Sequence, residues 1–282
     1  MRIAEIHSTD LTDSCMRRVY HRHMGEITGN TTTALYRGLV AGKALELIHE
    51  DGFKQGSPNL VVAAASETEK QLSSENRLLS EAVEEGRQDI LAEVTAIVDL
   101  YRSRLGPIFE VCGYVGSEIP VRLETGFGRF ASHLDLLVRD KQGLLGYGQN
   151  RLVIIDWKWR KDTPSGSYLV RNFQFMLYYL MVREGQARVF DHGGDMDWIA
   201  FDEEPVVMWC HLPSLKPYSR KTITKDDNGE EKEYKRGDGR PLRSILKAVQ
   251  YDPGQIKEMK EELALRAKMI EQDIFPLNPD PT

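Results

Sequence analysis

Hydrophobic and polar residues alternate with two different periods along the chain, and the change comes near residue 108. Before it, apolar residues recur every three or four positions, which is typical of amphipathic helices. This pattern predicts a helix over residues 31–50, capped within the run Thr31-Thr32-Thr33 and ended at Gly52. It predicts a longer helix over residues 76–105, which Gly106-Pro107 is expected to stop.

Strand-like runs follow in the second half of the chain. Residues 108–124, 129–139 and 150–159 are rich in β-branched and aromatic side chains, and glycines separate them. We expect three consecutive strands that are antiparallel neighbours. Three further elements are predicted, namely a helix over about 168–184, a strand over 204–211 and an amphipathic helix over 253–272.

The order of these elements predicts one α/β domain that spans residues 1–282. A central mixed β-sheet would be flanked by helices, with residues 54–106 as a helical insertion before the core strands. Residues 214–240 are highly charged and contain the turn signal Asp226-Asp227-Asn228-Gly229, so we expect an exposed hairpin or loop there.

Composition narrows the class of protein. A chain of 282 residues with 41% hydrophobic and 28% charged residues is typical of globular domains. The N-terminus has no apolar core of signal-peptide length, and no apolar stretch is long enough to span a bilayer, so we expect a cytoplasmic protein without a membrane partner. The cysteines Cys15, Cys112 and Cys210 are isolated from one another and predict no disulfide framework.

The net charge of −6 argues weakly against a protein that coats DNA. An enzyme that binds divalent metals needs local carboxylates, however, and can keep its basic residues in one groove. Net charge therefore leaves a nucleic-acid partner open.

The run from Leu152 to Trp159 holds the first candidate chemistry. Its unbroken apolar stretch predicts a strand buried on both faces, so a carboxylate and an ammonium within it are costly unless they pair or bind a ligand. Asp156 and Lys158 lie two positions apart, so both side chains leave the same face of the strand.

The preceding strand adds a second carboxylate, Asp135, among apolar neighbours. A hairpin would bring Asp135 beside Asp156, where the two negative charges repel one another unless a cation lies between them. Hard oxygen ligands favour Mg²⁺ or Mn²⁺ over zinc. Either aspartate alone is more commonly part of a structural ion pair, so the hypothesis depends on their order, their spacing and the helix that follows.

That helix carries a polar strip. Gln174 and Tyr178 are four residues apart and share one face, with Arg171 on the same side, while Phe173, Met176, Leu177 and Leu180 form an apolar face. Such a strip directly after the Asp-x-Lys strand suits the wall of a DNA groove, and half-buried polar groups of purely structural role are an equal alternative.

An aspartate, then a strand with Asp-x-Lys, then a helix with Gln-x-x-x-Tyr resembles the RecB-type branch of the PD-(D/E)XK nucleases. The matching residues are Asp135, Asp156, Lys158, Gln174 and Tyr178. An upstream helix of that family carries Gly-x-x-x-His-x-x-x-Glu. Here Gly38 and Glu46 match that motif, and Gly42 stands in place of the histidine.

Two further segments carry the resemblance. Glu118 resembles the glutamate that opens the first core strand, and the segment Ser14-Cys15-Met16-Arg17-Arg18 resembles the first helix of the family. The cysteine of that helix belongs to an iron–sulfur cluster in some members. Because the C-terminal cysteine trio of those members is absent here, no iron–sulfur cluster is expected.

The resemblance implies a restriction-endonuclease-like core and a metal-dependent nuclease. Asp135, Asp156, the backbone carbonyl of Trp157 and Glu46 would hold Mg²⁺ or Mn²⁺, and Lys158 would orient the attacking water. Gln174 and Tyr178 would position the strand or the lysine. Phosphate contacts would come from the basic residues Arg17, Arg18, Arg160, Lys161 and Arg171.

The implied function is an exonuclease acting on single- or double-stranded DNA in recombination, repair or end processing, such as a phage encodes. Its partners would be DNA and either a recombination protein or further copies of the chain. Alternatives remain open: a structure-specific or restriction-type endonuclease, or an inactive DNA-binding module on the nuclease fold. Gly42 slightly favours the inactive module, and the costly charges of Asp135, Asp156 and Lys158 disfavour it. A non-nuclease α/β protein with chance matches would bind no divalent metal at the two aspartates.

Overall fold

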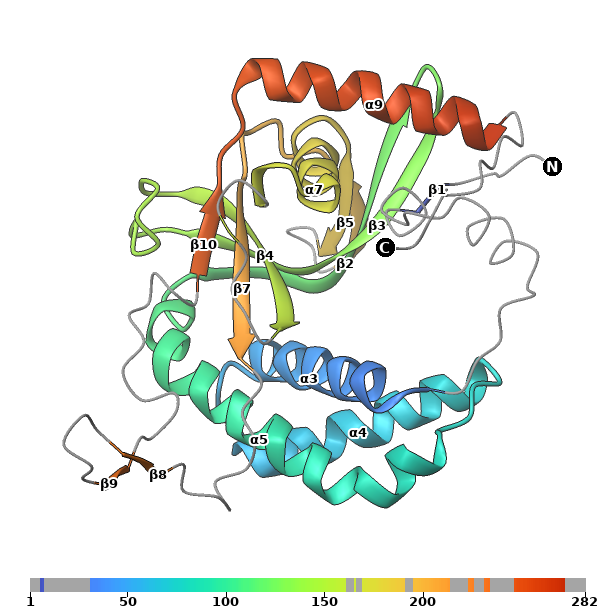
Figure 1. Ribbon diagram of the computed structural model, residues 1–282. Coiled ribbons are helices and arrows are strands. Elements are labelled where there is room, and N and C mark those ends of the chain that lie inside the picture. The colour runs from blue at the N-terminus through green and yellow to red at the C-terminus, as the bar shows by residue number, and fades with distance from the viewer. Residues whose placement is uncertain are drawn as a thin grey trace.

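A mixed β-sheet of eight strands forms the centre of the molecule (Figure 1). The computed structural model describes residues 6–7, 31–160, 165, 169–190, 195–213, 223–225, 231–233 and 246–271. The strand order is β10-β7-β4-β3-β2-β5-β6, and β1 pairs with β3 outside this path. The bounds are β1 (Ile6–His7), β2 (Gly113–Thr125), β3 (Gly128–Asp140), β4 (Arg151–Arg160), β5 (Gln186–Phe190), β6 (Met196–Ile199), β7 (Val206–Pro213) and β10 (Leu246–Val249).

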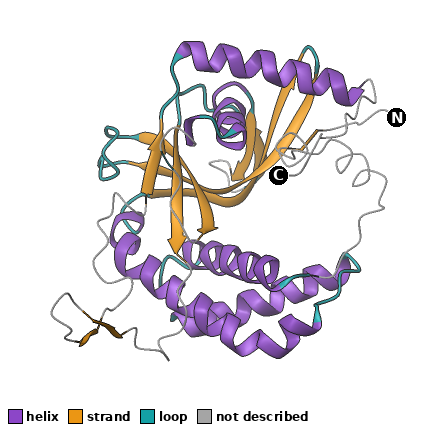
Figure 2. Cartoon of the chain, in the orientation of Figure 1, coloured by secondary structure: helices purple, strands orange, loops and turns teal. Residues whose placement is uncertain are grey.

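Helices cover both faces of this sheet (Figure 2). Three of them, α3 (Thr33–Glu50), α4 (Ser57–Ser74) and α5 (Glu81–Phe109), share one hydrophobic core with the sheet. On the opposite face, α7 (Phe173–Glu184) and α9 (Pro253–Glu271) form a second core. The predicted α/β fold with a central mixed sheet flanked by helices is confirmed.

The central strand β4 explains why its sequence is apolar on both faces. It pairs antiparallel with β3 and parallel with β7. Val153 and Ile155 face the core of α3, α4 and α5, whereas Leu152 and Ile154 face the core of α7 and α9. The predicted burial on both faces and the antiparallel pairing of the three consecutive strands are therefore confirmed.

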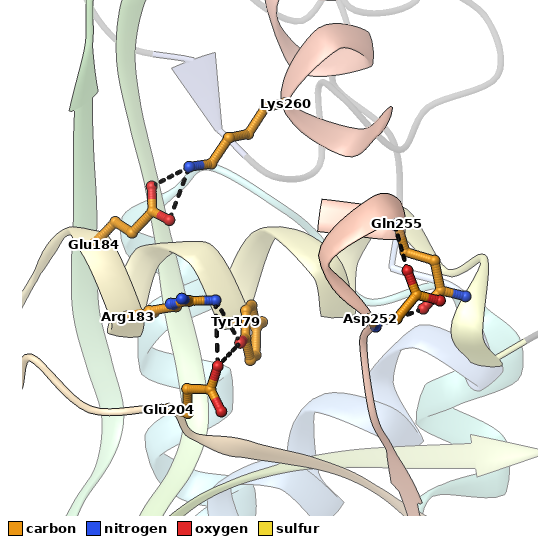
Figure 3. Close-up of polar contacts among 7 residues, drawn as sticks. All are labelled: Tyr179, Arg183, Glu184, Glu204, Asp252, Gln255 and Lys260. Carbon is orange, nitrogen blue, oxygen red and sulfur yellow. Dashed lines mark hydrogen bonds and ion pairs between the residues drawn. The ribbon is translucent and has the colours of Figure 1, made fainter. Parts of the chain in front are cut away.

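The position of α7 matters because this helix carries Gln174 and Tyr178. Asn172 caps its N-terminus by accepting from the N–H of Phe175 at 3.3 Å. Lys260 of α9 pairs with Glu184 at the other end, at 2.7 Å (Figure 3). The start of α9 is fixed by reciprocal hydrogen bonds between Asp252 and Gln255, each 2.9 Å, in the manner of a capping box. These contacts fix the start of each helix and join α7 to α9.

Two boundaries of the helical region differ from the prediction. Gly106 and Pro107 do not stop α5, which continues to Phe109, so the first long strand begins at Gly113 and not at residue 108. Pro107 removes only one donor near the end of the helix, and the N–H of Glu110 still reaches the carbonyl of Gly106 at 2.8 Å. The polar insertion that precedes α5 contains a full helix, α4, with Pro58 in its first turn.

Four short strands of the described residues, β1, β5, β6 and β10, were not predicted. Within the charged segment 214–240, β8 (Ile223–Lys225) pairs antiparallel with β9 (Glu231–Glu233). None of the helices in the described ranges combines the length and the apolar character needed to cross a membrane.

Candidate active site

The candidate site lies where β3 and β4 separate. The two strands pair from Asp140↔Arg151 to Leu136↔Ile155, and the pairing ends there. One step further the register sets Asp135 opposite Asp156, as the predicted hairpin requires. The N–H of Trp157 donates to Oδ2 of Asp135 at 2.7 Å. The carboxylate thus accepts a hydrogen bond that a backbone carbonyl of β3 would accept if the two strands continued to pair. We call this region, with Asp135 and residues 156–158, the fork.

Asp156 and Lys158 form an ion pair in the fork. Nζ of Lys158 donates to Oδ1 of Asp156 at 2.7 Å. The Asp156 side chain is fully buried, whereas that of Lys158 is 25% exposed. The lysine thus reaches solvent with its charge held by a buried carboxylate, which agrees with the predicted common face of the two side chains.

Gln174 and Tyr178 approach the fork from α7. Nε2 of Gln174 donates to the Tyr178 hydroxyl at 2.6 Å, so the two share a helix face as predicted. Burial, together with the negative charges of Asp156 and Asp135, holds the pKa of Tyr178 well above its usual value of 10. The hydroxyl therefore stays protonated beside the two aspartates and can donate a hydrogen bond.

Helix α3 closes the other side of the fork. A pocket of about 580 Å³ lies between α3, α4 and the inner strands β2, β3, β4 and β7. Glu46, Glu118, Asp135 and Lys158 line it, and Asp156 does not. Glu46 pairs with Lys43 at 2.9 Å, and Lys43 also reaches Glu67 at 3.1 Å. Lys43 was missed by sequence reasoning, although its place three residues before Glu46 on one helix face could have indicated it.

Glu118 enters the pocket from an irregular part of β2. Its φ angle is 46°, a left-handed conformation that costs a residue with a side chain about 1 kcal/mol or more. Burial raises the pKa of Glu118 to about 7, and the charges of Asp135 and Glu46 act in the same direction. Lys43 and Lys158 oppose the rise. Carboxylates thus outnumber their cationic partners at this end of the pocket.

This donor set fits a divalent cation. Among the described residues, no three His, Cys, Asp or Glu side chains already stand in a metal-binding cluster. Glu118, Asp135 and Glu46 nevertheless line the pocket together, and the charges of Asp135 and Glu46 add to the burial that raises the pKa of Glu118. Oxygen ligands of this kind suit Mg²⁺ or Mn²⁺, and a cation there would relieve the repulsion.

The two histidines near the site have different surroundings. His133 lines the pocket. His49 points into a cluster of rings that includes Phe53, Phe109 and Trp157, and its Nε2 lies 2.6 Å from the Tyr101 hydroxyl. Burial lowers the pKa of His49 to about 3, so it is a neutral core residue and lies outside the pocket lining.

Among the predicted phosphate contacts, Arg171 is the one whose side chain the structure describes. Arg171 precedes α7, is exposed and lines a different groove, between α7 and α9, so its predicted place on the Gln174–Tyr178 face is wrong. Arg17, Arg18 and Lys161 lie outside the described residues, as do the segment 14–18 and the side chain of Arg160.

Comparison with known families gives one finding that agrees with this geometry. The sequence model of the PD-(D/E)XK nuclease superfamily matches residues 8–282, which include every residue of the fork and the pocket. A search of curated proteins gave no match.

Proposed function

Because the chain belongs to the PD-(D/E)XK nuclease superfamily, we propose that it is a divalent-metal-dependent deoxyribonuclease whose active site is the fork. The observation that carries this proposal is the register of β3 and β4. It sets Asp135 opposite Asp156, with Lys158 paired to Asp156 and open to the pocket.

Carboxylates from four elements, α3, β2, β3 and β4, would hold the metal. Asp135, Glu46 and Glu118 line one end of the pocket, and Asp156 and the carbonyl of Trp157 lie next to it in the fork. Bound there, Mg²⁺ or Mn²⁺ lowers the pKa of a water molecule and stabilises charge on the phosphate.

The side chains around this end have separate tasks. Lys158, oriented by the buried carboxylate of Asp156, donates to the attacking water and offsets the charge that develops on the phosphate. Tyr178, kept protonated, donates a hydrogen bond on the α7 side, and Gln174 orients it. Because these groups are held by protein contacts before substrate arrives, little reorganisation is needed during the reaction.

The finer assignment is an exonuclease of the RecB type in DNA recombination or end processing in the cytoplasm. The Gln-x-x-x-Tyr helix supports it, because it resembles processing exonucleases more than restriction enzymes. An endonuclease is the alternative, and an inactive DNA-binding module is a second one. Gly42 slightly favours the inactive module, because it stands where relatives carry a histidine. The nearby Glu46 pairs with Lys43.

The test is cleavage of end-labelled linear DNA and of circular DNA with Mg²⁺ or Mn²⁺. We expect Asp135→Asn and Lys158→Ala each to lower the cleavage rate about 100-fold or more. Lys257→Ala is the matched control, because Lys257 is 79% exposed on α9 and remote from the pocket. Cleavage of linear DNA alone would support the exonuclease. An inert parent protein that still binds DNA would overturn the nuclease proposal in favour of the binding module.

A further inference from the structure

The pocket continues beyond the carboxylates, along α3 toward its N-terminal end. Glu46, Gly42 and Gly38 follow one another at intervals of four residues along the helix and all line the pocket. At a rise of about 1.5 Å per residue, this wall extends about 12 Å from the carboxylate end. The proposed chemistry uses only the end near Glu46 and assigns no role to the rest of the pocket.

An aromatic ring forms one side of that remainder. Trp159 follows Lys158 on β4, lines the pocket and is half-buried. The guanidinium carbon of Arg37 lies 5.6 Å from the centre of the Trp159 ring, and Arg37 is itself paired with the buried Glu93 at 3.1 Å. The Arg37 guanidinium thus covers one face of the Trp159 ring and limits its rotation, so the other face is the one on which a base would stack.

The opposite side is open and polar. A Cβ atom placed on Gly38 or Gly42 would meet nothing within 4 Å, so protein atoms do not fill the space above this part of α3. Thr68 and Gln71 of α4 line the same end with a hydroxyl and an amide. A fixed aromatic face opposite hydrogen-bonding groups is the chemistry that recognises a nucleobase, which has a π-face and a polar edge.

We propose that this end of the pocket binds one unpaired nucleobase of the substrate strand, stacked on Trp159 beside the phosphate that is cleaved. The inference rests on the proposed nuclease function and adds the substrate class, a strand with an unpaired nucleotide at the site. A base inside a duplex is stacked on its neighbours, so it must leave that stack before it can stack on Trp159 between α3 and the strands.

The first test is binding, measured in Ca²⁺ by fluorescence anisotropy of a fluorescein-labelled single-stranded DNA. Trp159→Ala should weaken binding about 5- to 100-fold, and Trp159→Phe should retain most of it. Trp198→Ala is the matched control, because Trp198 also packs against an arginine, with the guanidinium carbon of Arg122 4.1 Å from its ring centre, but lies in β6 away from the pocket. Equal binding by the parent and Trp159→Ala, or no binding by the parent, would overturn the subsite.

The second test moves one abasic residue along the oligonucleotide and measures cleavage with Mg²⁺. The parent should cleave 5- to 100-fold more slowly, roughly the value of one stacked base, when the abasic residue is next to the cleaved phosphate. Trp159→Ala should cleave intact and abasic strands at the same rate, because the base has already lost its partner. An abasic effect that persists unchanged in Trp159→Ala would overturn the subsite. A parent that binds with the expected Trp159 dependence but never cleaves would leave the subsite supported and refute the nuclease proposal.

Discussion

The buried imidazole of His49 predicts how the protein responds to acid. His49 lies near the end of α3 with 6% of its surface exposed, between rings whose centres are 5.0 Å (Phe53) and 5.3 Å (Phe109) away. Burial lowers the pKa of His49 to about 3, against about 6.5 in an unfolded chain. Between these two pKa values, His49 is neutral in the folded protein and protonated in the unfolded chain.

The sign of the effect follows from this difference. Above pH 6.5 the His49 imidazole is neutral in both the folded and the unfolded state, so its titration does not lower the free energy of unfolding there. Between pH 6.5 and 3 the unfolded chain gains a proton that the folded protein does not, so the free energy of unfolding decreases as the solution becomes more acidic. At pH 5 the loss from this single group is about 2 kcal/mol relative to pH 7.5.

The assay is urea unfolding at pH 7.5 and pH 5.0 of the parent and of His49→Gln, which keeps a neutral polar group in the same place. The parent should lose about 2 kcal/mol more than His49→Gln between the two pH values. Tyr101→Phe is the control, because it removes the hydrogen bond at 2.6 Å without removing the titrating group. It should lower stability by about 1–3 kcal/mol at both pH values. Equal losses in the parent and His49→Gln would refute the reasoning.

Three further predictions concern single residues. The buried carboxylate of Asp140 accepts the N–H groups of residues 143, 144 and 145 at 2.9, 3.0 and 2.8 Å, so Asp140→Ala should lower the free energy of unfolding by about 3 kcal/mol in urea. The pKa of Glu118 is raised to about 7 in the folded protein. Its contribution to the free energy of unfolding is therefore complete below about pH 4.5 and is lost as the pH rises through 7. Metal-free Glu118→Gln should therefore lose less stability than the parent between pH 5 and pH 8, measured in urea. Gly42→His should fold normally, because the space above Gly42 is open, and should bind Mn²⁺ more tightly in calorimetry. Unchanged Mn²⁺ affinity would contradict that expectation.

The elements nearest the fork could be predicted because their signals are local. An apolar run of strand length indicates burial on both faces, and two positions along a strand return to the same face, whatever the rest of the chain does. The relation of Asp156 to Lys158 and that of Gln174 to Tyr178 depend only on such periods. The opposition of Asp135 to Asp156 needed one more assumption, a hairpin between consecutive strands.

The parts that could not be predicted depend on contacts between distant segments. Pro107 is accepted near the end of α5 because the helix end is packed, with Phe53 3.5 Å from a Cβ placed on Gly106. Glu118 adopts a left-handed conformation between Ser117 and Ile119, which pair with β3 while Glu118 does not, and no sequence period reports such a gap. The strands β5, β6 and β10 have only four or five residues, and β5 and β10 pair with β2 and β7, which lie far away in the chain.

Register links the fold of this protein to its proposed chemistry. If β4 slipped by one residue against its neighbours, Asp156 and Lys158 would exchange faces with Trp157 and Trp159. The charges would then point into the core of α3, α4 and α5, and two indole rings would face α7. Burying an ion pair in that apolar core costs several kcal/mol, so the alternation that defines the core also fixes the charges at the fork. Trp159 and Lys158 are consecutive on β4 and both line the pocket, so a stacking surface and an ammonium can serve adjacent parts of one substrate strand.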